Sequence, residues 1–100
     1  MKKVFIITRK DLENGARIVQ SVHSFHELAR KNEEILNQVY NTICYKIEDE
    51  LSLKEVSERI ASNLNEKEYA WFRETDYNNQ LTSFAVFTNK KELFKGLRLA

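Results

Sequence analysis

The stretch KVFIITRKDLENGARIVQSVHSFHELAR, Lys3 to Arg30, decides the fold of this chain. It opens with an apolar run over residues 4–7, which is typical of a buried central strand. A polar turn over residues 8–15 then leads into a helical pattern. In open α/β sheets, ligands usually bind where a strand feeds a helix, because the free N–H groups of the helix N-terminus lie there. We therefore expect this stretch, which also carries His23 and His26, to frame any site.

Composition indicates one globular domain over residues 1–100. Apolar residues make up 42% of the chain and charged residues 31%, which is ordinary for such a domain. The formal net charge of +1 argues against wrapping a long nucleic-acid duplex, because that binding neutralises many phosphates. With two glycines and no proline, the chain has no glycine-rich phosphate loop of the usual kind.

The cysteine and histidine content argues against metal binding. Cys44 is the only cysteine, so neither an intramolecular disulfide nor a cysteine-based zinc site is expected, and we expect its side chain to be buried. His23 and His26 are three residues apart, yet no convincing third ligand lies nearby, and we expect no metal or other cofactor. No apolar run is long enough for a signal peptide or membrane span, which favours a cytoplasmic protein without membrane contact.

Hydrophobic periodicity predicts the helices. The first helix is expected to begin near Asn14, whose side chain can cap it. The core face of this helix is expected to consist of Ile18, Val22, Phe25, Leu28 and Ala29. A second helix is expected from residue 33, with Ile35, Leu36, Val39 and Tyr40 buried. Ser52 and Glu55 fit a capping box and predict the start of a third helix.

Strands are predicted over residues 4–8, 42–48, 69–73 and 81–87. A polar turn over residues 74–80 joins the last two as an antiparallel pair. The element order is therefore β-α-α-β-α-β-β, and a strand–helix–strand start implies a right-handed crossover. We predict a single-domain α/β three-layer sandwich, with a four-stranded mixed sheet and helices on both faces.

This order, together with two motifs, resembles the type 2 peptidyl-tRNA hydrolases, the small archaeal and eukaryotic kind. That family has an R-x-D-L turn and a Q-x-x-H helix, matched here by Arg9-Lys10-Asp11-Leu12 and Gln20-Ser21-Val22-His23. Its hydrophobic strand, acidic turn and Leu-rich helix match residues 43–60, and its final L-K-L matches Gly96-Leu97-Arg98-Leu99. The resemblance covers nearly the whole chain and implies that family's fold.

The chain departs from the family at the catalytic lysine. Asn14-Gly15-Ala16-Arg17 takes the place of the family's Gly-Lys-Gly-Lys run, and Ala16 stands where the lysine is expected. Arg17 keeps a positive charge, but its guanidinium stays protonated and cannot act as a base. Lys10, in the turn before the helix, is the candidate for the missing amine.

Other catalytic positions of the family keep a related side chain. Glu74 stands at the place of the family's aspartate, with Asp76 as its neighbour. Ser83 matches the family's catalytic threonine and keeps a hydroxyl. The resemblance thus implies Glu74, Asp76, Ser83 and Lys10 as catalytic candidates.

A second group is expected to bind the ligand. Arg9, Lys10 and Arg17 are expected to surround a helix N-terminus, where free N–H groups already favour phosphate. Matched motif positions add Asp11, Gln20 and His23 to this group. The alternative interpretation is that the cations are solvated surface charges and His23 is a partly buried helix residue bonded to a neighbour.

These residues support two hypotheses on function. The first is an enzyme that hydrolyses the ester between a peptide or aminoacyl group and the 3′ end of tRNA, with Glu74 or Asp76 orienting water. The second is a non-catalytic binding module on the same fold, such as an accessory or phage protein. Its ligand is then a nucleotide-like small molecule, an RNA end or a protein partner. A homodimer formed through a sheet edge or through a surface rich in Tyr and Trp is a third, separate expectation.

Overall fold

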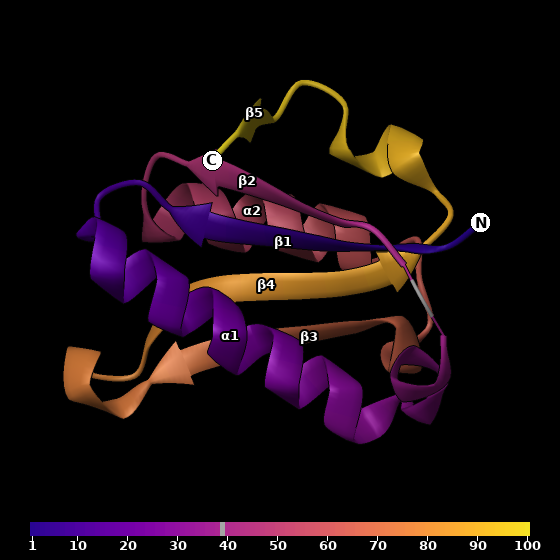
Figure 1. The fold of residues 1–100 in the computed structure, drawn as a ribbon. Helices are drawn as coiled ribbons and strands as arrows, with labels where there is room; N and C mark the ends of the chain where they lie inside the picture. Colours follow the sequence, from indigo (N-terminus) through magenta and orange to yellow (C-terminus); the bar gives the residue numbers. More distant parts are fainter. Residues whose placement is uncertain (39) are drawn as a thin grey trace.

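Strand β1 (Lys3–Arg9) lies inside a five-stranded mixed sheet of order β3-β4-β1-β2-β5 (Figure 1). The computed structural model describes residues 1–38 and 40–100. Strand β1 is parallel to β2 (Thr42–Ile47) and antiparallel to β4 (Gln80–Thr88). The outer strands are β3 (Tyr69–Glu74), antiparallel to β4, and the short β5 (Arg98–Leu99), antiparallel to β2.

Helices α1 (Asn14–Lys31) and α2 (Glu50–Ala61) cover opposite faces of this sheet (Figure 1). Strand alternation divides the core accordingly. Val4 and Ile6 of β1 pack with Leu28 of α1, whereas Phe5 and Ile7 pack in the cluster that contains Leu53 of α2. The predicted single α/β domain with a mixed sheet and helices on both faces is thus confirmed.

The number of strands and the second helix differ from the prediction. The sheet has five strands, because the chain end folds back and Arg98 and Leu99 pair with Lys46 and Tyr45 of β2. The predicted second helix is a 3₁₀ turn, η1 (Glu33–Asn37), in which Ile35 is buried and Leu36 is exposed. Val39, also expected on its buried side, lies outside the described residues.

Helix α2 begins two residues before the predicted cap. The side chain of Asp49 accepts a hydrogen bond from the Ser52 N–H, so Asp49 is the N-cap and Ser52 lies inside the helix. Asp is as strong a cap as Ser, and here it precedes the first helical residue. The remaining short turns are η2 (Glu66–Glu68), η3 (Thr75–Tyr77) and η4 (Lys91–Phe94). Within the described residues, no helix has the length and apolar character needed to cross a membrane.

Candidate functional site

Helix α1 confirms the predicted core face only in its C-terminal half, where Leu28 and Ala29 are buried; in its N-terminal half it buries polar side chains and exposes the apolar ones that were expected in the core. Gln20 and Ser24 are buried with Leu28 and Ala29, while Ile18 and Val22 are 66% and 59% exposed. The helix packs chiefly against β4 and β3, so the flank that carries Ile18 and Val22 lies beside β2. Asn14 is the first helical residue, and Glu13 precedes it without a side-chain cap. A buried polar face of this kind needs partners on the sheet.

Gln20 has partners on both β3 and β4. Its Nε2 donates to Glu74 Oε1 at 3.0 Å, and its Oε1 accepts from the Thr82 hydroxyl at 2.8 Å. Its backbone carbonyl accepts from the Ser83 hydroxyl at 2.6 Å. We call these four residues, Gln20, Glu74, Thr82 and Ser83, the Gln20 cluster. Gln20, Thr82 and Ser83 are at most 3% exposed.

A β-bulge lets two consecutive residues of β4 reach the same helix. Phe72 pairs with Ser83 and Arg73 with Leu81, which leaves Thr82 without a partner on β3. In a regular strand, Thr82 and Ser83 would point to opposite faces. The bulge turns both hydroxyls toward α1, and bulges of this kind often re-aim side chains next to functional sites.

Glu74 ends β3 and is the charged member of the Gln20 cluster. The hydrogen bond from Gln20 lowers the pKa of its carboxyl, and the N–H groups of Asp76 and Thr75 and the charge of His23 lower it further. Glu74 is therefore ionised at neutral pH. The side chain of Asp76 is exposed, and that residue contributes to the cluster only through its backbone N–H.

His23 lies on the flank of α1 that is near Glu74 of β3. Its ring stacks on Phe72 at a centroid distance of 4.7 Å, and the residue is half-buried. His26 is exposed. Among the residues that the structure describes, no group of three or more His, Cys, Asp or Glu side chains is arranged to hold a metal ion.

Arg9 and Lys10 do not join the helix N-terminus as predicted. Arg9 follows Phe5 and Ile7 in alternation, so its side chain lies on the α2 face of the sheet. Its guanidinium donates to both carboxylate oxygens of Asp11 at 2.9 Å, and also to Gln80 Oε1 and the Leu81 carbonyl. Arg9 and Asp11 thus form a structural ion pair beside α2.

Lys10 points away from the Gln20 cluster. Its Nζ forms a 2.8 Å ion pair with Glu48, and both side chains are well exposed. The structure therefore brings together Gln20, Glu74 and Ser83 of the predicted residues, with His23 and the backbone of Asp76 beside them. It leaves Arg9, Lys10 and Asp11 outside this group.

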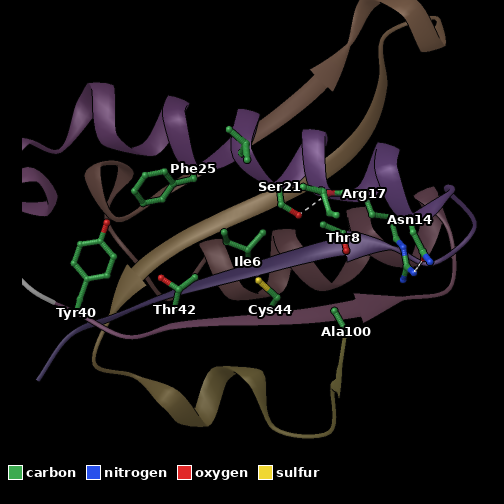
Figure 2. A pocket seen from close by; sticks show the side chains of 12 residues that line it. Ile6, Thr8, Asn14, Arg17, Ser21, Phe25, Tyr40, Thr42, Cys44 and Ala100 are labelled. Atoms are coloured by element: carbon green, nitrogen blue, oxygen red, sulfur yellow. Dashed lines mark hydrogen bonds between the residues drawn. The ribbon is translucent and has the colours of Figure 1, made fainter.

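Arg17 lies on the other flank of α1, in a pocket between this helix and strands β1 and β2 (Figure 2). Its guanidinium donates to the Asn14 side chain, while its Nε is buried and meets no hydrogen-bond partner among the described residues. The pocket has a volume of about 770 Å³. We call it the α1–β2 pocket; it is lined by Ile6, Thr8, Asn14, Arg17, Ile18, Ser21, Val22, Phe25, Tyr40, Thr42, Cys44 and Ala100.

Two of these features were missed or misplaced by sequence reasoning. Thr82 was not predicted, although it precedes the predicted Ser83 and only the bulge makes both face the helix. Cys44 was predicted to be buried but is exposed in the pocket, because α1 does not extend over β2. Desolvation nevertheless raises the pKa of its thiol.

Comparison with known proteins supports the fold alone. Neither a protein-family model nor a curated protein sequence matches the chain. A solved structure similar to it is that of Atu0240, a protein of unknown function from Agrobacterium tumefaciens. The two share 15% sequence identity with a TM-score of 0.71, over 99% of this chain and 97% of the other. The architecture is therefore shared across nearly the full length of both chains.

Proposed function

We propose that the protein is a diverged type 2 peptidyl-tRNA hydrolase-like enzyme that hydrolyses the ester at the 3′ end of aminoacyl- or peptidyl-tRNA. One observation carries this proposal. Gln20, Glu74 and Ser83 match positions of that family, and they meet in one cluster although Glu74 and Ser83 lie 54 and 63 residues from Gln20. Their meeting point is also the end of β3 beside the first turns of α1, where α/β folds commonly bind ligands.

The chemistry assigned to the Gln20 cluster is hydrolysis without a cofactor. The Glu74 carboxylate accepts a hydrogen bond from a water molecule and takes its proton as the water oxygen attacks the ester carbon. The bond between that carbon and the ribose oxygen then breaks, and the proton passes from Glu74 to that oxygen, which leaves as the ribose hydroxyl. The Gln20 amide holds Glu74 in position through its 3.0 Å hydrogen bond.

Negative charge on the substrate is matched by the N-terminal end of α1. No acidic residue lies in the first turn of this helix, so its free N–H groups attract a phosphate or an oxyanion. Arg17 is one turn further along and is not paired with any carboxylate among the described residues. We assign to Arg17 alone the phosphate-binding role that the sequence analysis predicted for Arg9, Lys10 and Arg17 together.

A binding module without turnover is the second candidate, and the placement of two catalytic candidates favours it. The Ser83 hydroxyl is fully buried and donates to a backbone carbonyl, so its role in this structure is to position Gln20. Lys10, the candidate for the family's amine, is engaged with Glu48. On this second hypothesis, the same surface binds a tRNA end or a nucleotide-like ligand and leaves the ester intact.

The two candidates are separated by incubating the protein with N-acetylaminoacyl-tRNA and measuring release of the N-acetylamino acid. An enzyme should release it, and Glu74→Gln should lower the rate by about a hundredfold, the scale of general-base catalysis. Glu58→Gln, on the exposed side of α2, is the matched control. Binding of the tRNA without release would favour the binding module, and neither binding nor release at stoichiometric protein would refute both candidates.

A further inference from the structure

We propose that the α1–β2 pocket binds a small amphipathic carboxylate, with the carboxylate at Arg17 and an alkyl or aryl body along Val22 and Phe25. Glu74 and the rest of the Gln20 cluster do not line this pocket, so the site is distinct from the proposed hydrolytic centre and shares with the proposed function only Arg17 and the N-terminal end of α1. Its volume of about 770 Å³ lies within the range of small-molecule sites.

The apolar part of the pocket consists of side chains that the fold leaves without partners. Ile18 and Val22 of α1 are more than half exposed, and they line the pocket together with Ile6 of β1. Adjacent exposed apolar side chains on a helix are costly in water, and such a patch usually marks a binding surface. Phe25 and Tyr40 stand at one end, with ring centroids 6.4 Å apart.

The polar part of the pocket lies at the opposite end. Arg17 and Asn14 stand there, close to Thr8 and Ser21 (Figure 2). None of the lining side chains is acidic, and Arg17 is the charged one among them. Its Nε is buried and meets no acceptor within the described residues, and a buried donor of this kind is normally satisfied by some partner.

The two ends together select the class of ligand. A carboxylate satisfies the guanidinium of Arg17 and also benefits from the N-terminal end of α1, whose first turn carries no acidic residue. Arg17 and Phe25 are eight positions apart, about 12 Å along the helix axis at 1.5 Å per residue. An acid of the length of octanoate to dodecanoate fits that span, whereas a short polar anion leaves the apolar end empty.

Cys44 provides a reporter inside the pocket, because it is the only cysteine and its thiol is exposed there. Alkylation of the intact protein by a neutral maleimide is followed with and without decanoate below its micelle concentration. Decanoate should slow the reaction in a saturable way, and decanol should protect at least about tenfold more weakly, the loss expected for a charge-assisted hydrogen bond. Unchanged alkylation at saturating decanoate would overturn the assignment.

Substitutions on α1 locate the binding. Val22→Asp places a negative charge in the pocket and should weaken decanoate binding, measured by calorimetry, about tenfold or more. Val19→Asp makes the same change on the exposed flank outside the pocket and should leave the affinity unchanged. Arg17→Gln should weaken decanoate but not decanol. Equal loss of decanoate affinity in Val22→Asp and Val19→Asp would refute the site. Equal loss of decanoate and decanol affinity in Arg17→Gln would refute the carboxylate end at Arg17.

A second copy of the chain is the competing occupant of this apolar surface. If a dimer covered it, Cys44 would be protected without ligand and sedimentation would show a protomer pair. That result would overturn the carboxylate assignment. Failure of tRNA-ester hydrolysis would leave it intact, since that reaction is assigned to the Gln20 cluster.

Discussion

Replacing Thr82 with Val removes one hydroxyl from the Gln20 cluster and keeps the shape of the side chain. Thr82 is fully buried, and its hydroxyl donates to Gln20 Oε1 at 2.8 Å. Gln20 is 3% exposed, so in the variant its Oε1 loses this donor without gaining free access to water. A buried polar atom left unsatisfied costs about 1–3 kcal/mol, and we expect the free energy of unfolding to fall by about 2 kcal/mol.

Urea unfolding followed through the fluorescence of Trp71, the only tryptophan, measures this loss. Thr88→Val is the matched control in the same strand. The Thr88 hydroxyl accepts from the Lys90 N–H, and Lys90 is exposed, so water can replace the lost acceptor and the cost should be smaller.

The double variant with Gln20→Met tests the coupling directly. In Gln20→Met alone, the Thr82 hydroxyl keeps the Phe72 carbonyl as an acceptor at 3.3 Å. In the double variant both partners are gone, so the loss should be smaller than the sum of the two single losses by about 1 kcal/mol or more. Additive losses, or a loss below about 0.5 kcal/mol in Thr82→Val, would refute the cluster as a connected network.

Three further predictions concern charges around the sheet. Hydrogen bonds in the folded state lower the pKa values of the Glu74 and Asp49 carboxyl groups. The stability that these two groups contribute is therefore present above their pKa values in the unfolded chain, and it is lost as the pH falls through their pKa values in the folded protein. The unfolding free energies of Glu74→Gln and of the wild type should therefore converge in acid; a constant difference at all pH values would contradict this. Because Asp49 caps α2, Asp49→Ala should lower the melting temperature, measured by circular dichroism, by a few degrees, and Ser52→Ala should lower it by less. A larger decrease in Ser52→Ala than in Asp49→Ala would place the cap at Ser52. Arg9→Met should lower the free energy of unfolding in urea by about 2 kcal/mol, which is less than the loss of a fully buried ion pair because Asp11 is 41% exposed. Lys10→Met, which breaks an exposed pair, should lower it by less than about 1 kcal/mol. Equal losses in the two variants would contradict the buried position of Arg9.

The chain order of most elements could be predicted from local patterns. The apolar run of β1 and the alternation of β2 require only the spacing of apolar residues, because that spacing decides which element can bury them. The two-residue strand β5 has too little sequence to show a period, and it exists because Leu99 and Arg98 can pair with β2. The 3₁₀ turn at residues 33–37 likewise replaced a predicted helix in a segment too short to be decided by its pattern.

The rotation of helix α1 about its own axis, which decides the side chains that it buries, could not be predicted from the sequence. Its apolar spacing predicted a core face that runs from Ile18 and Val22 to Leu28 and Ala29; the last two are buried, but Ile18 and Val22 are exposed. In the N-terminal half of the helix, the hydrogen bonds of Gln20 to Glu74, Thr82 and Ser83 place polar side chains against the sheet. A periodic pattern identifies a helix and its apolar side, but partners 54 to 63 residues away along the chain decide which side is buried.

The sequence by itself determined the class of the domain, its mixed sheet and the position of the first helix after a central strand. A family resemblance named Gln20, Glu74 and Ser83 as candidates, and the structure shows that they are hydrogen-bonded to one another. Only the tertiary structure decided which charged side chains are available to bind a ligand. Strand alternation sends Arg9 to the α2 face, where Asp11 neutralises it, and leaves Arg17 in the α1–β2 pocket. The physical reason is that burial and pairing depend on distances between strands and helices, and the order of residues along a strand–turn–helix segment does not contain those distances.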